Sequence, residues 1–132
     1  ADLSGLQELH HLEYLFITFG AISDLRPISH LHKLKALFVP ANQLTSLQGI
    51  EQMTELRELY CNNNKITTLA PLRQLTQLET LYCQYNELEN LDGLTPEHRP
   101  VLQQLFVMPN PRLSFPAIQQ VEQEVGLRCR RG

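Results

Sequence analysis

The sequence lacks the features that mark membrane and nucleic-acid-binding proteins. No run of about 18 or more apolar residues occurs, which excludes a membrane-spanning helix. Basic residues number 11 against 14 acidic ones, and the formal net charge is −3, so nothing attracts nucleic acid or anionic lipid in general. The start at Ala1 has neither a basic nor an apolar leader region, and we expect a processed form or a fragment.

Motifs of enzymes and metal sites are also missing. The sequence contains no Ser/His/Asp order, no glycine-rich phosphate loop and no CxxC pair, so we expect no catalytic residue and no cofactor. Four histidines, His10, His11, His30 and His32, suggest a surface zinc or nickel site beside Glu8 or Glu13. His10 and His32 are 22 residues apart and are expected to stack, but Thr54 and Thr76 fill this position elsewhere. We therefore interpret the histidines as polar surface residues and expect no metal.

Cysteines are few, only three, and two of them are placed regularly. Cys61 and Cys83 occupy a position that Ile17, Val39 and Val107 fill in other parts of the chain. Both are therefore predicted to be small core residues, with side chains too parallel for a disulfide. Cys129 stands beside Arg128, Arg130 and Arg131 near the end of the sequence. We expect it to be an exposed free thiol whose pKa these arginines lower.

What the sequence does have is a period of 22 residues. Leucines share one phase throughout, at Leu3, Leu25, Leu47, Leu69 and Leu91, and the third position of each unit alternates Gly5, Pro27, Gly49, Pro71, Gly93. One unit has too little apolar surface to fold alone, so the units must stack. We predict a single domain over 1–132, with units at 3–24, 25–46, 47–68 and 69–90, an irregular unit at 91–113 and a cap at 114–127.

Each unit contains a short stretch with apolar residues two positions apart, which is typical of a β-strand. The pairs are Leu15/Ile17, Leu37/Val39, Leu59/Cys61, Leu81/Cys83 and Leu105/Val107. Because each strand is followed by a turn and a return segment, the five strands should pair in parallel. An asparagine follows most strands, at Asn42, Asn64, Asn86 and Asn110. A buried amide there would satisfy backbone groups of adjacent turns.

These motifs resemble the leucine-rich repeat family. The segment Leu78-Glu79-Thr80-Leu81-Tyr82-Cys83-Gln84-Tyr85-Asn86-Glu87-Leu88 has the family's L-x-x-L-x-L-x-x-N-x-L pattern. The 22-residue length is similar to the internalin-type subclass of bacterial surfaces and to the phosphatase-regulator subclass of eukaryotes. The resemblance covers about residues 3–113. It implies an α/β solenoid with a parallel β-sheet on the concave side, short 3-10 or irregular convex segments, and protein binding on the concave side.

The last unit departs from the pattern. The leucines that mark its strand come two residues later than the period requires, so we expect a bulge there. Thr95, Pro96 and Glu97 are residues typical of the N-cap, the N1 position and the first turn of a short helical turn. Ile118, Val121 and Val125 then recur at helical spacing after Ser114-Phe115-Pro116 and before Gly126 and Leu127. This segment is predicted to be a capping helix.

The other end of the array has no such cap. Leu12, Leu15 and Ile17 would present an unpaired strand edge and an open apolar core. Two alternatives stay open: an upstream segment covers this edge, or copies of the chain associate end to end through the N-terminal repeat.

Aromatic residues form a second register. Between the two inward residues of each strand lies one residue that must point outward, and all five are aromatic: Phe16, Phe38, Tyr60, Tyr82 and Phe106. Tyr14, Phe19 and Tyr85 lie beside this row. The row could be a cross-strand ladder that stabilises the sheet. An exposed apolar stripe more often marks a binding site, and Tyr and Phe are favoured interface anchors.

The polar residues around the row are mixed in sign. They include Glu13, Lys35, Arg57, Glu58, Glu79, Asn62, Asn63, Gln84 and Gln104. Such a rim fits a protein or peptide ligand, and only Lys35 and Arg57 would suit a single-stranded nucleic acid. Of these we assign Arg57, Glu58, Asn62 and Gln84 to the binding site with the aromatic residues. A carbohydrate stacked on the rings stays as a minor alternative.

We therefore expect a non-catalytic module that binds a protein or peptide on its concave face. The alternative is the sensing or targeting segment of a larger enzyme or effector. The internalin-like resemblance favours secretion or a bacterial surface, whereas unpaired cysteines favour a reducing interior, so both compartments stay open.

Overall fold

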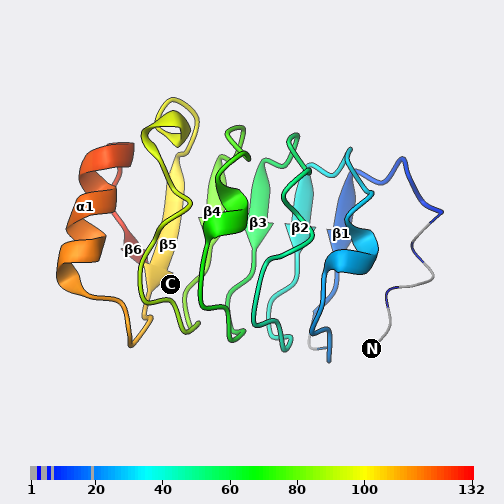
Figure 1. Cartoon of the computed structure of the whole chain (residues 1–132), viewed down its shortest axis with the longest axis horizontal. Helices are drawn as coiled ribbons and strands as arrows, with labels where there is room; N and C mark the ends of the chain where they lie inside the picture. Colours follow the sequence, from blue (N-terminus) through cyan, green and yellow to red (C-terminus); the bar gives the residue numbers. More distant parts are fainter. Residues whose placement is uncertain (1–2, 4–5, 7, 19) are drawn as a thin grey trace.

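The fold is an open stack of short parallel strands, described here by a computed structural model for residues 3, 6, 8–18 and 20–132. Six strands form one sheet in sequence order, side by side along the long axis in Figure 1. Their bounds are β1 Tyr14–Phe16, β2 Ala36–Phe38, β3 Glu58–Tyr60, β4 Thr80–Tyr82, β5 Gln104–Met108 and β6 Arg130–Arg131. The five predicted strands are confirmed, and β6 was not predicted.

The core lies between the sheet and the return segments. Leu37, Leu59, Leu81 and Leu105 are fully buried and pair in register across β2 to β5. Cys61 and Cys83 are fully buried free thiols, as predicted. The side chains of Leu12, Leu15 and Ile17 are only partly buried, because β1 has a strand neighbour on one side alone within the described residues.

The buried asparagines join successive units, which confirms their predicted role. Asn64 is typical: its Nδ2 donates to the carbonyl oxygens of Val39 and Cys61, both at 3.0 Å, and its Oδ1 accepts from the backbone N–H of Leu44 at 3.0 Å. Asn42, Asn86 and Asn110 make the corresponding bonds in their own units. One side chain thus satisfies backbone groups of two turns that would otherwise be buried without partners.

The return segments are of two kinds, which explains the alternation of glycine and proline. Pro27 and Pro71 lie in the first turn of the 3-10 helices η2 (Arg26–Ile28) and η3 (Ala70–Leu72). Gly49 has φ of +115°, and a Cβ there would lie 2.8 Å from the carbonyl carbon and oxygen of Leu25. Proline therefore starts one kind of turn, and glycine lets the next turn approach it closely.

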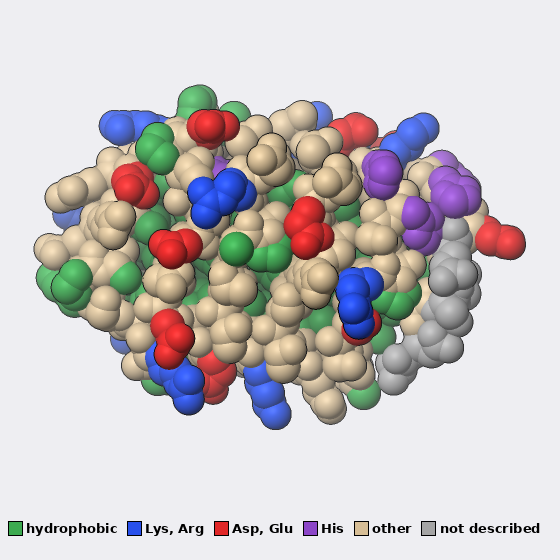
Figure 2. Space-filling model, in the orientation of Figure 1, with side chains coloured by type: hydrophobic (Ala, Val, Ile, Leu, Met, Phe, Trp, Pro, Cys, Tyr) green, Lys and Arg blue, Asp and Glu red, His purple; other side chains and the backbone are tan. Residues whose placement is uncertain are grey.

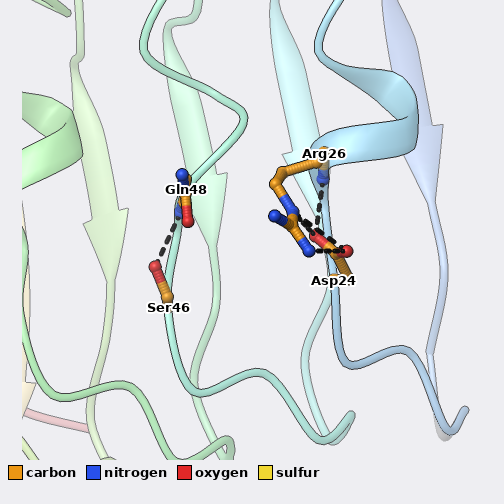
Figure 3. Close-up of polar contacts among 4 residues, drawn as sticks. All are labelled: Asp24, Arg26, Ser46 and Gln48. Atoms are coloured by element: carbon orange, nitrogen blue, oxygen red, sulfur yellow. Dashed lines mark hydrogen bonds and ion pairs between the residues drawn. The ribbon is translucent and has the colours of Figure 1, made fainter.

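A row of small polar side chains stabilises the entry to each return segment. Asp24, Ser46, Thr68 and Asn90 each accept a hydrogen bond from the backbone N–H two residues later, at 2.9–3.1 Å. Figure 3 shows the first two of these turns and the added ion pair between Asp24 and Arg26, 2.8 Å apart. This row has the same 22-residue period but was missed in the sequence, because the residue type varies.

The two additional residues of the last unit are taken up in its return segment. Tyr82 pairs with Phe106, 24 positions later, whereas earlier strand partners are 22 positions apart. The expected helical turn is η4 (Pro96–His98), and Thr95 Oγ1 accepts from the N–H of Glu97. The fully buried His98 accepts from the Thr95 N–H through Nδ1 and bonds the Leu72 carbonyl through Nε2 at 3.0 Å. This imidazole therefore ties η4 to the preceding unit.

The predicted capping helix is confirmed as α1 (Phe115–Val125), which covers the end of the sheet opposite β1 (Figure 1). Ser114 caps its N-terminus by accepting from the Ala117 N–H, and Gly126 ends it with φ of +67°. Val121 and Val125 are buried in the core.

The chain then returns to the sheet as β6, and this corrects the prediction for Cys129. The Cys129 thiol is buried, because its backbone N–H donates to the Glu122 carboxylate at 2.9 Å and β6 follows at once. Burial, with a smaller contribution from Glu122, raises the pKa of Cys129 to about 12. The neighbouring arginines are exposed to solvent and do not lower the pKa of the thiol, in contrast to the prediction.

The surface over the return segments is polar and mixed in charge (Figure 2). Histidines gather there at the end of the molecule that carries β1. His10 packs edge-on against His30, with ring centroids 5.2 Å apart, and not against His32 as predicted. No helix among the described residues has the length and apolar character needed to cross a membrane.

Candidate partner-binding face

The five outward aromatic residues lie in one row across the sheet. Strand pairing places Phe16, Phe38, Tyr60, Tyr82 and Phe106 in direct register on neighbouring strands. We call the sheet surface that carries this row the concave face. Every member comes from the same position of its repeat, between two core residues, so the repeat aligns the row, with a step of 24 residues before Phe106.

The rings are stacked on one another. Successive ring centroids are 4.2–4.3 Å apart, and the interplanar angles are 12–26°. An inner ring such as Tyr60 therefore has both π-faces covered by neighbours, and its edge is left toward solvent. Partial burial, together with nearby Tyr82 and Glu58, raises the pKa of the Tyr60 hydroxyl. The cross-strand ladder is thus present, and each stack contributes about 0.5–1.5 kcal/mol beyond area burial.

Exposure is greatest at the β1 end of the row. Phe16 is 61% exposed and Tyr14, two residues before it on the same strand face, is 58% exposed. Phe38, Tyr60, Tyr82 and Phe106 are partly buried by their neighbours in the stack. Tyr85 is 49% exposed at the turn after β4, where its φ is +60°. Phe19, also predicted for the site, lies outside the described residues.

Of the predicted polar site residues, three remain accessible. Arg57 is exposed, and Glu58 and Asn62 are partly exposed. The Asn62 amide donates to Asn63 Oδ1 at 2.7 Å. Lys35, which sequence reasoning assigned to the rim, is engaged by Glu13 with Nζ and Oε1 3.3 Å apart.

Gln84 was wrongly predicted to be available to a partner. Its side chain is only 7% exposed, because Gly132, directly after β6, lies against the amide. Without knowledge of β6, the sequence pattern places Gln84 on the open face beside Asn62. The added strand covers that position.

Two residues of β6 at the end of the face were missed altogether. Arg130 of β6 pairs with Phe106 and takes the sixth place in the row, and Arg131 pairs with Met108 after a register shift. Both are exposed. The alternation Leu127-Arg128-Cys129-Arg130 has the period of two that marks a strand, and it is the signal that could have revealed β6.

The described residues contain no cluster of three or more His, Cys, Asp or Glu side chains able to hold a metal ion. Burial raises the pKa of the Cys61 thiol to about 12 and that of Cys83 well above its usual value. These thiols are therefore neutral and inaccessible.

Comparison with known proteins agrees with the repeat pattern. A family model described as leucine-rich repeats (two copies) matches residues 32–74 and again residues 54–96. No curated protein has a significant match to the chain. The family model thus shows leucine-rich repeats over residues 32–96, in agreement with the family that the sequence predicted.

Solved structures define the fold more closely. An internalin (InlF) of Listeria monocytogenes has a TM-score of 0.83 at 23% identity, over 98% of this chain and 37% of the internalin. Internalin C2 of the same species has a TM-score of 0.82 at 22% identity, over 97% of this chain and 56% of internalin C2. A leucine-rich-repeat protein of Leptospira interrogans has a TM-score of 0.88 at 24% identity, over 100% of this chain and 34% of the Leptospira protein. The chain therefore has the internalin-like fold and spans between a third and somewhat over half of these chains.

Proposed function

We propose that the chain is a non-catalytic recognition module that binds a partner protein or peptide across the concave face. The observation that carries the proposal is the continuous row of five rings on an open sheet, with Tyr14 and Phe16 more than half exposed. A leucine-rich-repeat fold fits a protein-interaction module, and large rigid side chains offer contact area at small entropic cost.

Stability alone does not account for this surface. Stacking explains why the rings align, yet β1 leaves two large apolar side chains toward water where a polar residue would also fit a strand. Burying the part of each side chain that is still exposed would contribute about 1–2 kcal/mol, which is available to a partner that covers them.

The stack also favours a peptide over the carbohydrate that we kept as an alternative. A sugar packs on the face of an aromatic ring, and a nucleic-acid base does the same. In this row neighbouring rings 4.2–4.3 Å away occupy the inner faces. Ring edges and the tyrosine hydroxyls remain, and these suit side-chain and backbone groups of a protein.

The test is peptide selection from a random phage library on the immobilised chain, followed by affinity measurement of the selected peptides. Replacing Tyr14 and Phe16 together by Ser should weaken binding about tenfold or more, because the exposed anchors are lost. Tyr60 and Tyr82 are less suitable for substitution because each is stacked on both faces, so stability would change as well.

Phe115→Ser is the matched control, since Phe115 is 68% exposed but lies on α1, away from the sheet. It should leave affinity unchanged. Binding that survives the loss of Tyr14 and Phe16 but is abolished by the change at Phe115 would place the site elsewhere and overturn the proposal.

A further inference from the structure

The concave face changes character toward its β6 end. Arg130 lies in register with Phe106, and Arg131 with Met108. The row therefore begins with the exposed apolar side chains of β1 and ends with exposed Arg130, which exposed Arg131 follows on the same strand. The change from apolar to charged side chains follows the direction in which the rings are stacked.

The two arginines have no carboxylate partner among the described residues. The ion pairs of the described chain lie elsewhere, at Asp24–Arg26, Glu13–Lys35 and between Arg112 and Glu87 or Glu89. Glu122 is engaged by the backbone N–H of Cys129. Gln104 and Met108 of β5 are uncharged, so the adjoining strand supplies no acid either. Arg130 and Arg131, two like charges at consecutive positions of β6, thus have no acidic partner among the described residues.

The ring edges point to the same chemistry. The edge of an aromatic ring is its electropositive part, whereas the face is electronegative. Because stacking covers the inner faces, the row presents edges and tyrosine hydroxyls, all of which prefer oxygen acceptors. Backbone carbonyls therefore complement the ring edges and hydroxyls, whereas carboxylates fit best at the arginine end, away from Glu58 beside Tyr60.

We propose that the concave face takes an extended acidic segment of a partner protein, with an apolar residue against Tyr14 and Phe16 and carboxylates against Arg130 and Arg131. Five strand spacings of about 4.8 Å separate Phe16 from Arg130, about 24 Å in all, which an extended chain crosses with about seven residues. The acidic residues of the partner thus lie about seven positions from its apolar anchor. This inference rests on the proposed function and names the partner chemistry for the same face.

The phage selection tests it when three proteins are used as bait. These are the unchanged chain, the double variant Arg130→Gln/Arg131→Gln, and the control Lys33→Gln/Arg73→Gln. The control removes the same charge from exposed positions of the return segments. The unchanged chain and the control should select peptides with Asp or Glu about seven residues from an apolar residue. Those peptides should bind the Arg130/Arg131 variant about tenfold more weakly, and salt should weaken binding to the unchanged chain more than to that variant.

The outcomes separate this inference from the proposed function. Peptides that depend on Tyr14 and Phe16 but show no acidic preference, or that bind the Arg130/Arg131 variant equally well, would overturn the inference and leave the proposed function standing. Peptides whose binding depends neither on Tyr14 and Phe16 nor on Arg130 and Arg131 would overturn both the inference and the proposed function. Self-association that sedimentation detects and that the Arg130/Arg131 variant abolishes would show a second copy as the occupant, which also overturns the inference.

Discussion

At the scale of single residues, the buried asparagines have a larger share in stability than their number suggests. Asn64 alone satisfies the carbonyls of two neighbouring units and the N–H of Leu44. Apolar contacts between leucine side chains are not directional, whereas the hydrogen bonds of each amide fix the position of one turn relative to the next. A buried backbone group that loses its partner costs about 1–3 kcal/mol, so one substitution can affect several groups at once.

Asn64→Ala should therefore lower the free energy of unfolding by about 2–4 kcal/mol, since at least two buried backbone groups lose their partner. Urea unfolding followed by circular dichroism would measure the loss. Asn90→Ala is the matched control, because exposed Asn90 makes a single turn hydrogen bond to Asp92 N–H. It should cost about 1 kcal/mol or less. Equal losses at the two positions would contradict a special role for the buried amides.

The three buried thiols make stability depend on alkaline pH. The pKa of Cys61 and of Cys129 is raised to about 12, and that of Cys83 is raised as well, mainly by burial. In the unfolded chain a thiol has a pKa of about 8.5, so above that pH the unfolded state releases protons that the native state keeps. The free energy of unfolding should thus be unaffected by the thiols below about pH 8. Above that pH it should fall by about 1.4 kcal/mol per thiol for each pH unit.

Urea unfolding at a series of pH values would test this dependence. Cys61→Val serves as the control, because Val39 and Val107 already occupy the equivalent core position. This variant should lose part of the alkaline slope and keep its stability near neutral pH. An unchanged slope would mean that other groups account for the alkaline loss.

At the scale of elements, the strands of the repeats were predictable and the C-terminal strand was not. Leucines such as Leu59 and Leu81 combine a period of two with a period of 22, and both signals mark the same strand. β6 is short and does not fall at the strand position of the 22-residue repeat, and its residues Arg130 and Arg131 are typical of a solvated C-terminal tail. Its burial of Cys129 and Gln84 depends on α1 bringing the chain back to the sheet, which is a tertiary effect absent from the local pattern.

The two kinds of return segment allow a matched test at one repeat position. Gly49→Ala should cost about 2–4 kcal/mol, because its φ is +115° and the new Cβ would meet the Leu25 carbonyl 2.8 Å away. Pro27→Ala, at the same position of the preceding repeat, should cost about 1 kcal/mol or less. Thermal unfolding would compare them, and similar losses would show that the alternation has no structural role.

At the scale of the whole molecule, the chain is a one-dimensional array whose two ends differ. In such an array each unit is stabilised by contacts with its neighbours alone. β6 and α1 cover the last repeats. Within the described residues β1 pairs only with β2, and Leu15 of β1 and Ile17 directly after it stay partly exposed. The most exposed anchors of the proposed binding face, Tyr14 and Phe16, therefore lie on the least supported strand.

Hydrogen exchange can measure this asymmetry with three equivalent amides. The N–H groups of Ile17, Cys61 and Cys83 each donate to the carbonyl of the next strand, at 2.7, 2.8 and 2.8 Å. Their bond lengths and repeat positions match, so only their place in the array differs. Ile17 should exchange through local fraying of β1, at least about tenfold faster than Cys61 and Cys83, which need wider opening. Equal protection at all three would mean that the array opens as a single unit, and binding at β1 would then not involve ordering of that strand. If the prediction holds, a ligand that bridges Tyr14 and Arg130 should protect Ile17 most, because it adds contacts to β1, which pairs only with β2 within the described residues.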